Sequence, residues 1–246
     1  MLAKLLLGIV QGITEFLPVS SSGHLVMLKH LFGLNTPGAF YEVFLHSATL
    51  LSIIVVLRDK IFNRREFWRY LRLSIVATLP LFAVVPFASE IEATFSSPSI
   101  LPFTFAFTSV LLLSTYFVRE PGRMPNWADA LIMGLFQTLA LLPGISRSGS
   151  TISVALHRKV SPDEAFSLSF WMFLPASAGS FVLEAIRLNG SHVSLSPWDA
   201  VVWILTFAVG VLSLIFLRKI LSLGGNFWMF GIYTLGLSIL SAFLFL

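Results

Sequence analysis

The sequence predicts an all-α membrane protein that crosses the bilayer several times and is built from an inverted repeat. The chain is 56% hydrophobic and 11% charged, and its mean hydropathy is +0.87. A soluble domain of 246 residues cannot bury that much apolar surface. Two loops rich in serine and glycine also lie at matching places in the two halves of the chain. Composition therefore predicts the membrane, and the paired loops predict the repeat.

The two loops read FLPVSSSGHL at residues 16–25 and PGISRSGST at residues 143–151. Matching residues are separated by 126 positions: Gly8, Gln11, Ser20, Ser22 and Gly23 correspond to Gly134, Gln137, Ser146, Ser148 and Gly149. Hydroxyl and backbone groups find no water inside a bilayer, so such loops are tolerated there only when buried in protein or lining a cavity. We therefore expect the two loops to meet around a polar cavity.

Six apolar stretches are long enough to cross a bilayer as helices, at roughly 40–57, 73–88, 99–118, 164–187, 198–217 and 227–246. Basic residues fill the loops at 58–72 and 119–126, whereas the loop at 89–98 carries two glutamates and no base. The positive-inside rule therefore places the basic loops in the cytoplasm and both termini outside. Lys4 would then lie outside, against the rule.

Residues 1–32 and 127–158 are left over by this count, and each must enter and leave the membrane on one side. They are predicted to be re-entrant helical hairpins that approach from opposite faces. Each half is thus one hairpin plus three spans, and the odd number inverts the second half. The chain is one membrane domain, 1–246, in which repeat 1 covers about 1–118, a linker about 119–126 and repeat 2 about 127–246.

The first hairpin brings a carboxylate, serines and a histidine together. Gln11 and Glu15 are four residues apart and share a helix face, Pro18 ends the helix, and His24 follows the serine turn. This combination fits a nucleophile with a base. Ionisable side chains at bilayer depth are costly, about 2.5–3.5 kcal/mol for a basic one on insertion scales, so their first interpretation is functional.

The second hairpin suits an anionic oxygen cluster such as phosphate. A helix that begins after a glycine and serine turn presents free amides, and Arg147 adds a fork that holds two oxygens at once. A structural interpretation is also open, in which Glu15 and Arg147 only neutralise each other and the serines only allow close helix packing. Glu42 and His46 share a face of one span, where lining the cavity and bonding the hairpin are equally open.

The segments QGITEFLPVSSSGHL and LLPGISRSGST resemble the two signature regions of the undecaprenyl-diphosphate phosphatase family, also called the bacitracin-resistance family. The resemblance covers the whole chain in length and span layout. It implies hydrolysis of undecaprenyl diphosphate to undecaprenyl phosphate and phosphate, which recycles the lipid carrier for cell-wall synthesis. It also implies a multi-pass protein of the inner or plasma membrane, with an active site that opens outward and a divalent cation, Mg²⁺ or Ca²⁺, as cofactor.

The residues and the resemblance together assign the site. The catalytic residues expected are Glu15, Ser21, His24 and Arg147; the substrate-binding residues are Gln11, Ser20, Ser22, Ser146, Ser148 and Thr151; and the metal ligands are Glu15 and Gln11. His24 would take a proton as Ser21 or a water attacks the terminal phosphorus, and the nucleophile is left open between Ser21, His24 and water. Many family members have glutamate where this chain has Gln11, so Glu15 would carry the charge alone.

Two other functions have partial support in the sequence. A polyprenyl-phosphate flippase would use the same inverted-repeat site for transport rather than cleavage. A lipid phosphatase of the phosphatidic-acid type needs a second histidine about five residues after a serine and arginine pair, but here His157 is ten residues after Arg147. The expected partners are a polyprenyl diphosphate lipid and the bilayer, a homodimer is left open, and nucleic acid is not expected, since the basic residues lie in short loops.

Overall fold

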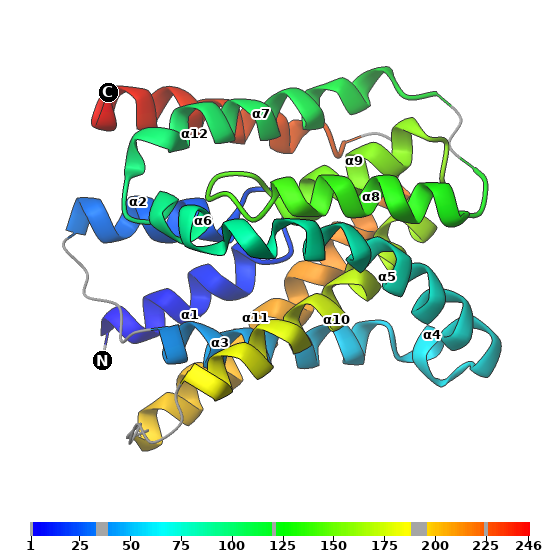
Figure 1. Ribbon diagram of the computed structural model, residues 1–246, viewed down its shortest axis with the longest axis horizontal. Helices are drawn as coiled ribbons and strands as arrows, with labels where there is room; N and C mark the ends of the chain where they lie inside the picture. Colours follow the sequence, from blue (N-terminus) through cyan, green and yellow to red (C-terminus); the bar gives the residue numbers. More distant parts are fainter. Residues whose placement is uncertain (1, 33–38, 120–121, 188–195, 224–225) are drawn as a thin grey trace.

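The computed structural model describes residues 2–32, 39–119, 122–187, 196–223 and 226–246, and all regular elements within these ranges are helical (Figure 1). The longer helices are α1 Leu2–Thr14, α2 Ser21–Phe32, α3 Ala39–Val56, α5 Arg64–Val84, α7 Leu101–Ser114, α8 Trp127–Leu139, α9 Arg147–His157, α10 Pro162–Arg187, α11 Pro197–Ser222 and α12 Met229–Phe245. The shorter ones are α4 Arg58–Phe62, α6 Ala88–Thr94 and the 3₁₀ turns η1 Val85–Phe87, η2 Pro98–Ile100 and η3 Thr115–Phe117.

Each of the six predicted spans falls on a helix: α3, α5, α7, α10, α11 and α12. Three stretches of the described residues are long and apolar enough to cross a membrane by length and composition, namely Arg64–Thr94, Pro98–Phe117 and Pro197–Ser222. The helix α5 begins nine residues before the predicted span, because the side chain of Asn63 accepts hydrogen bonds from the amides of Arg65 and Glu66 and caps its first turn. The protein is an all-helical membrane protein.

Two helical hairpins, α1 with α2 and α8 with α9, extend toward opposite ends of the molecule and meet at their tips (Figure 1). The tips are hydrogen-bonded to each other. The amide of Gly144 donates to Oγ of Ser20 at 3.1 Å, and Oγ of Ser148 donates to the carbonyl of Leu17 at 3.3 Å. The predicted meeting of the two loops is confirmed.

The same helix pairing occurs twice, with the halves exchanged. α1 packs on α11 and α8 packs on α5, while α7 and α12 lie side by side. A shift of 126 residues carries α1 onto α8 and α5 onto α11. Gly8 faces Val202 and Thr206 of α11, and Gly134 faces the backbone of Ala77 in α5, with no room for a side chain in either place. Each hairpin therefore packs against a helix of the other half.

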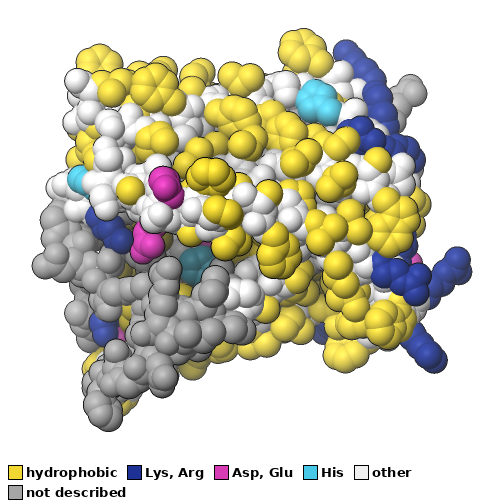
Figure 2. All heavy atoms as spheres, in the orientation of Figure 1, with side chains coloured by type: hydrophobic (Ala, Val, Ile, Leu, Met, Phe, Trp, Pro, Cys, Tyr) yellow, Lys and Arg dark blue, Asp and Glu magenta, His cyan; other side chains and the backbone are white. Residues whose placement is uncertain are grey.

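Charged and apolar side chains are segregated on the surface. Figure 2 shows hydrophobic side chains over most of the visible face, with Lys and Arg gathered at the end of the molecule where α4 and the start of α5 lie. Lys4 is far from that end in the fold and is ion-paired, because its Nζ lies 2.6 Å from Oδ1 of the buried Asp199. Lys4, whose expected place outside opposes the positive-inside rule, is thus neutralised by a partner in α11.

Candidate active site

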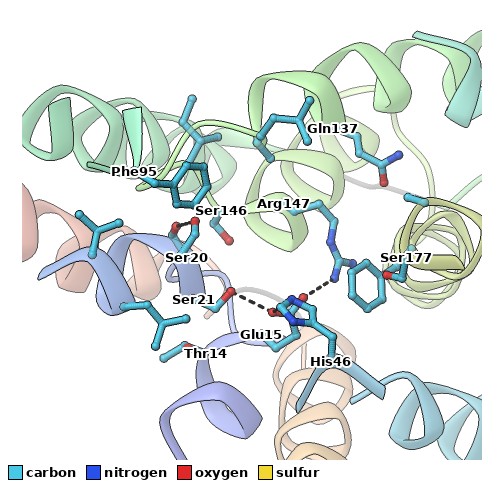
Figure 3. Close-up of a pocket in the computed structure, with 18 of the residues that line it drawn as sticks. Thr14, Glu15, Ser20, Ser21, His46, Phe95, Gln137, Ser146, Arg147 and Ser177 are labelled. Carbon is cyan, nitrogen blue, oxygen red and sulfur yellow. Dashed lines mark hydrogen bonds and ion pairs between the residues drawn. The ribbon is translucent and has the colours of Figure 1, made fainter. Parts of the chain in front are cut away.

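A cavity of about 430 Å³ lies where the two hairpin tips meet (Figure 3). Most of its wall area is apolar, and the residues that line it come from α1, α2, α3, α5, α8, α9 and α10 and from turns between helices. The polar and charged side chains that line it are Thr14, Glu15, Ser20, Ser21, Ser22, Lys29, His46, Gln137, Ser146, Arg147 and Ser177. A cavity with a largely apolar surface, on which polar groups converge, is the usual form of a ligand site.

Glu15 is the centre of the polar cluster. Its Oε2 accepts hydrogen bonds from Oγ of Ser21 at 2.9 Å and from Nε2 of Gln11 at 3.0 Å. Its Oε1 lies 3.3 Å from Nη2 of Arg147. The side chain of Glu15 is only 7% exposed, so these contacts act with little screening by water. A carboxylate that accepts a serine hydroxyl proton in hydrogen bonding is placed to activate that serine.

The tip of the first hairpin explains how Glu15 and Ser21 come together. α1 ends at Thr14 and α2 begins at Ser21, so both side chains leave the ends of helices that converge. Between them, Ser20 has φ of +67°, a left-handed conformation that is uncommon for serine. Its carbonyl lies 2.7 Å from Nδ1 of His24, and its Oγ accepts the amides of Gly23 and Gly144. These bonds hold the strained turn in place.

Arg147 is the first residue of α9, on the opposite hairpin. Its guanidinium stacks on Phe173 of α10, with Cζ 3.9 Å from the ring centroid, and lies 5.4 Å from that of Phe170. Nη2 faces Glu15, whereas Nη1 is buried without a hydrogen-bond partner. The guanidinium is therefore fixed by packing with part of its donor capacity unused.

The serine and threonine residues that the sequence predicts to bind substrate divide into two groups. Ser20, Ser22 and Ser146 line the cavity, although Oγ of Ser146 also caps α9 by accepting the amide of Gly149. Ser148 and Thr151 do not line it. Ser148 bonds to Leu17, and Oγ1 of Thr151 lies 2.7 Å from Oγ of Ser169, which ties α9 to α10. These two side chains hold the hairpin tips and helices together.

His24 does not face the cavity. Its Nε2 lies 2.9 Å from the hydroxyl of Tyr233, and its ring stacks on Tyr233 with centroids 5.9 Å apart. Phe105 contacts the ring edge-on at 6.0 Å. Both ring nitrogens thus have partners other than the hydroxyl of Ser21, namely the carbonyl of Ser20 and the hydroxyl of Tyr233, and the structure does not bring His24 to the carboxylate of Glu15.

A different histidine lies at the site. Nε2 of His46, in α3, is 3.6 Å from Oε2 of Glu15 and 3.4 Å from Nε2 of Gln11. The sequence alone does not place His46, since a shared helix face does not say what the face contacts. The side chain of Glu42, with which it was grouped, lies outside the described residues. The only signal in the sequence was a histidine within an apolar span.

The residues at the site fit a divalent cation only in part. Among the described residues, no three histidine, aspartate or glutamate side chains are grouped so that they could hold a metal ion. Among the side chains that the structure describes, Glu15 is the one acidic group that lines the cavity. Mg²⁺ is commonly bound through one or two carboxylates together with substrate phosphates. The donor set therefore fits a cation that is held jointly by Glu15 and a phosphorylated ligand.

The chain is similar to known proteins over nearly its whole length. Residues 4–240 match the family model described as bacitracin resistance protein BacA. A protein of Thermotoga petrophila named undecaprenyl-diphosphatase is 39% identical over 242 residues, which are 96% of this chain and 98% of the relative. Proteins with the same name from Methanococcus maripaludis and Salinibacter ruber are 34% and 39% identical, over 94% and 75% of this chain and 94% and 77% of the relatives.

Proposed function

The chain belongs to the bacitracin resistance protein BacA family, and on that premise we propose that it hydrolyses undecaprenyl diphosphate to undecaprenyl phosphate and phosphate. This activity recycles the lipid carrier for cell-wall synthesis. The observation that carries the proposal is the hydrogen bond from Ser21 to Glu15 beside Arg147, in a cavity whose surface area is mostly apolar. Ser21 can serve there as nucleophile, Glu15 as its base and the Arg147 guanidinium as the group that binds the anionic substrate. Transfer of a phosphoryl group from a lipid requires these three roles.

Ser21 is the proposed nucleophile. Its Oγ forms a bond to the terminal phosphorus while the bond from that phosphorus to the bridging oxygen breaks, and the hydroxyl proton passes to Oε2 of Glu15, 2.9 Å away. Undecaprenyl phosphate leaves with the bridging oxygen. A water molecule then attacks the phosphoserine, Ser21 regains a proton, and inorganic phosphate is released. The atoms balance as one water consumed per diphosphate cleaved.

Arg147 and the first turn of α9 bind the negatively charged phosphoryl groups of the substrate. The guanidinium is fixed on Phe173, and a helix N-terminus favours anions through its free amides and dipole. A divalent cation held by Glu15, with Gln11 beside it, would supply charge neutralisation for the diphosphate. Stabilisation of charge that develops on the transferred group is usually the largest contribution to such catalysis.

His24 is assigned a positioning role in this mechanism. Its Nδ1 is hydrogen-bonded to the carbonyl of Ser20, and its Nε2 is hydrogen-bonded to the hydroxyl of Tyr233. Ser20 precedes Ser21, so the ring of His24 fixes the turn that aims the nucleophile. Glu15, which contacts Ser21 directly, takes the role of base that sequence reasoning gave to His24.

The membrane arrangement follows from the repeat. The exchanged packing of α1 on α11 and α8 on α5 supports an inverted repeat with two re-entrant hairpins. The basic end of the molecule would face the cytoplasm. Lys29 in α2 and Phe95 after α6 line the cavity, and both belong to segments at the end of the molecule opposite the basic loops. This placement supports an opening toward the outside. The lipid tail would then remain in the membrane while its diphosphate enters.

Transport by the same architecture is not favoured. The curated relatives are named as diphosphatases, and carriage of an anion needs a cation and helix dipoles but no serine bonded to a carboxylate. Purified protein in detergent separates the two activities, because no sidedness exists there. We expect release of inorganic phosphate from pure undecaprenyl diphosphate and its loss after chelation of divalent cations. Absence of phosphate release by folded protein would refute hydrolysis.

A further inference from the structure

We propose that Gln137 and the free edge of the Arg147 guanidinium form a second anion subsite in the cavity. This subsite takes the phosphoryl group that is not attacked. The inference rests on the proposed function, since it assigns part of the same cavity to the second phosphate of a diphosphate. It concerns a residue, Gln137, to which the mechanism above gives no task.

Gln137 is buried with its hydrogen-bonding capacity unused. Its side chain comes from α8 and lines the cavity, it is 4% exposed, and neither Nε2 nor Oε1 has a hydrogen-bond partner. Arg147 lines the same cavity, and its Nη1 is buried and unpartnered as well. Buried polar groups nearly always have partners, and each one left without costs stability. Two such groups on one cavity indicate a ligand that supplies the missing oxygen atoms.

The internal repeat shows why Gln137 is free. Its counterpart Gln11 donates to Glu15 at 3.0 Å. The position 126 residues after Glu15 is occupied by Leu141, so the second half offers Gln137 no carboxylate. In the same way Arg147 stands where the first half has Ser21. The two halves have therefore diverged, the first into a reacting half and the second into an anion-holding half.

The placement of the two sides fits a diphosphate. In Figure 3, Gln137, Arg147 and Ser177 lie on one side of the cavity, and Glu15, Ser21 and His46 lie on the other. Nη2 of Arg147 points to Glu15, where the attacked phosphorus must be, which leaves Nη1 for the next phosphoryl group. A neutral amide adds a donor there without further charge. The subsite therefore distinguishes a diphosphate, which fills both places, from a monophosphate, which fills one.

Ligand binding, measured without catalysis, tests this inference. Inorganic pyrophosphate and orthophosphate are titrated against the purified protein in detergent, with thermal unfolding as the readout. For Gln137→Leu we expect the dissociation constant for pyrophosphate to rise at least about tenfold, as for loss of a hydrogen bond to a charged group. The constant for orthophosphate should change less than about threefold. The unliganded protein should be as stable as the wild type or more so, since an unpartnered amide is removed.

Ser153→Ala is the matched control. Its Oγ is also buried without a partner, but Ser153 does not line the cavity, so pyrophosphate affinity should not change. Gln137→Met, which keeps the unbranched shape, replaces the leucine variant if that one does not fold.

Wild-type affinity for pyrophosphate in a folded Gln137 variant would overturn the subsite, and so would a wild-type protein that binds no pyrophosphate. Binding that depends on Gln137, in a protein that releases no phosphate from the lipid, would instead refute the proposed hydrolysis and leave the subsite standing.

Discussion

Oε1 of Glu15 lies 3.3 Å from Nη2 of Arg147, and the two residues belong to opposite halves of the repeat. Neither hairpin alone contains both charges. The site therefore exists only when the two hairpin tips meet. The hydrogen bonds between Gly144 and Ser20 and between Ser148 and Leu17 join the two tips. This dependence links the stability of the fold to the geometry of the chemistry.

Replacement of Glu15 separates catalysis from a purely structural ion pair. Glu15→Gln keeps the shape but removes the only acidic side chain that lines the cavity within the described part of the chain, so hydrolysis that depends on metal should be abolished. The purified variant should remain folded and monodisperse, which size-exclusion chromatography checks. An unfolded or poorly inserted variant would instead support the ion-pair interpretation, in which a stranded buried arginine destabilises the protein.

Gln11→Glu is the companion variant. It adds a second carboxylate beside Glu15, and hard cations gain affinity with ligand charge. The concentration of metal for half-maximal activity should fall while activity at saturating metal is retained. A titration of Mg²⁺ and of Ca²⁺ measures this, and an unchanged midpoint would argue that no cation is held next to residues 11 and 15.

His24→Phe tests the positioning role of that side chain. The ring can still stack on Tyr233 and Phe105, but the bond to the carbonyl of Ser20 is lost. We expect kcat to fall at least about tenfold with KM within about threefold, because alignment of Ser21 suffers more than substrate binding. The pH profile of the residual activity should keep its shape. Loss of its acidic limb would instead identify His24 as the base.

Asp129 is expected to stabilise the basic end of the fold. It is fully buried and accepts from Nη2 of Arg123 at 2.7 Å, from the amide of Asn126 at 2.8 Å and from Arg158. Asp129→Asn should cost about 2 kcal/mol, less than for a fully buried pair, since both arginines are partly exposed. Thermal unfolding measures the loss. Asp59→Asn, on an exposed carboxylate, is the control and should leave the unfolding temperature unchanged.

The inverted arrangement makes a prediction about sidedness. The chain has no cysteine, so single cysteines can be placed at will. In the basic loop at 58–72, Arg65 is a suitable position because it is exposed, whereas the side chain of neighbouring Asn63 caps α5. In the loop at 89–98, Ser97 is exposed. Arg65→Cys and Ser97→Cys should be labelled by a membrane-impermeant maleimide from opposite sides of the bilayer. Labelling of both from one side would refute the span count and the inversion.

Much of the architecture could be predicted from the sequence, because apolar stretches and a repeated motif are local signals. The helices at the six spans, the two hairpins and the meeting of their tips all follow from such patterns. Side-chain directions were less predictable. His24 and Ser21 are one helical turn apart, which suggested joint action, but Tyr233, 209 residues further along the chain, draws the ring away. His46 reaches the site only through the packing of α3, which no local pattern reveals.

The role of Ser21 is tested most directly by phosphate release from pure undecaprenyl diphosphate by Ser21→Ala, compared with the wild-type protein at saturating substrate and metal. Both proteins are first shown to have the same unfolding temperature within about 2 °C, a shift of less than about 1 kcal/mol. If Ser21 is the nucleophile activated by Glu15, kcat should fall by about a thousandfold or more, equivalent to roughly 4 kcal/mol of transition-state stabilisation. Retention of a tenth or more of the wild-type kcat would contradict it.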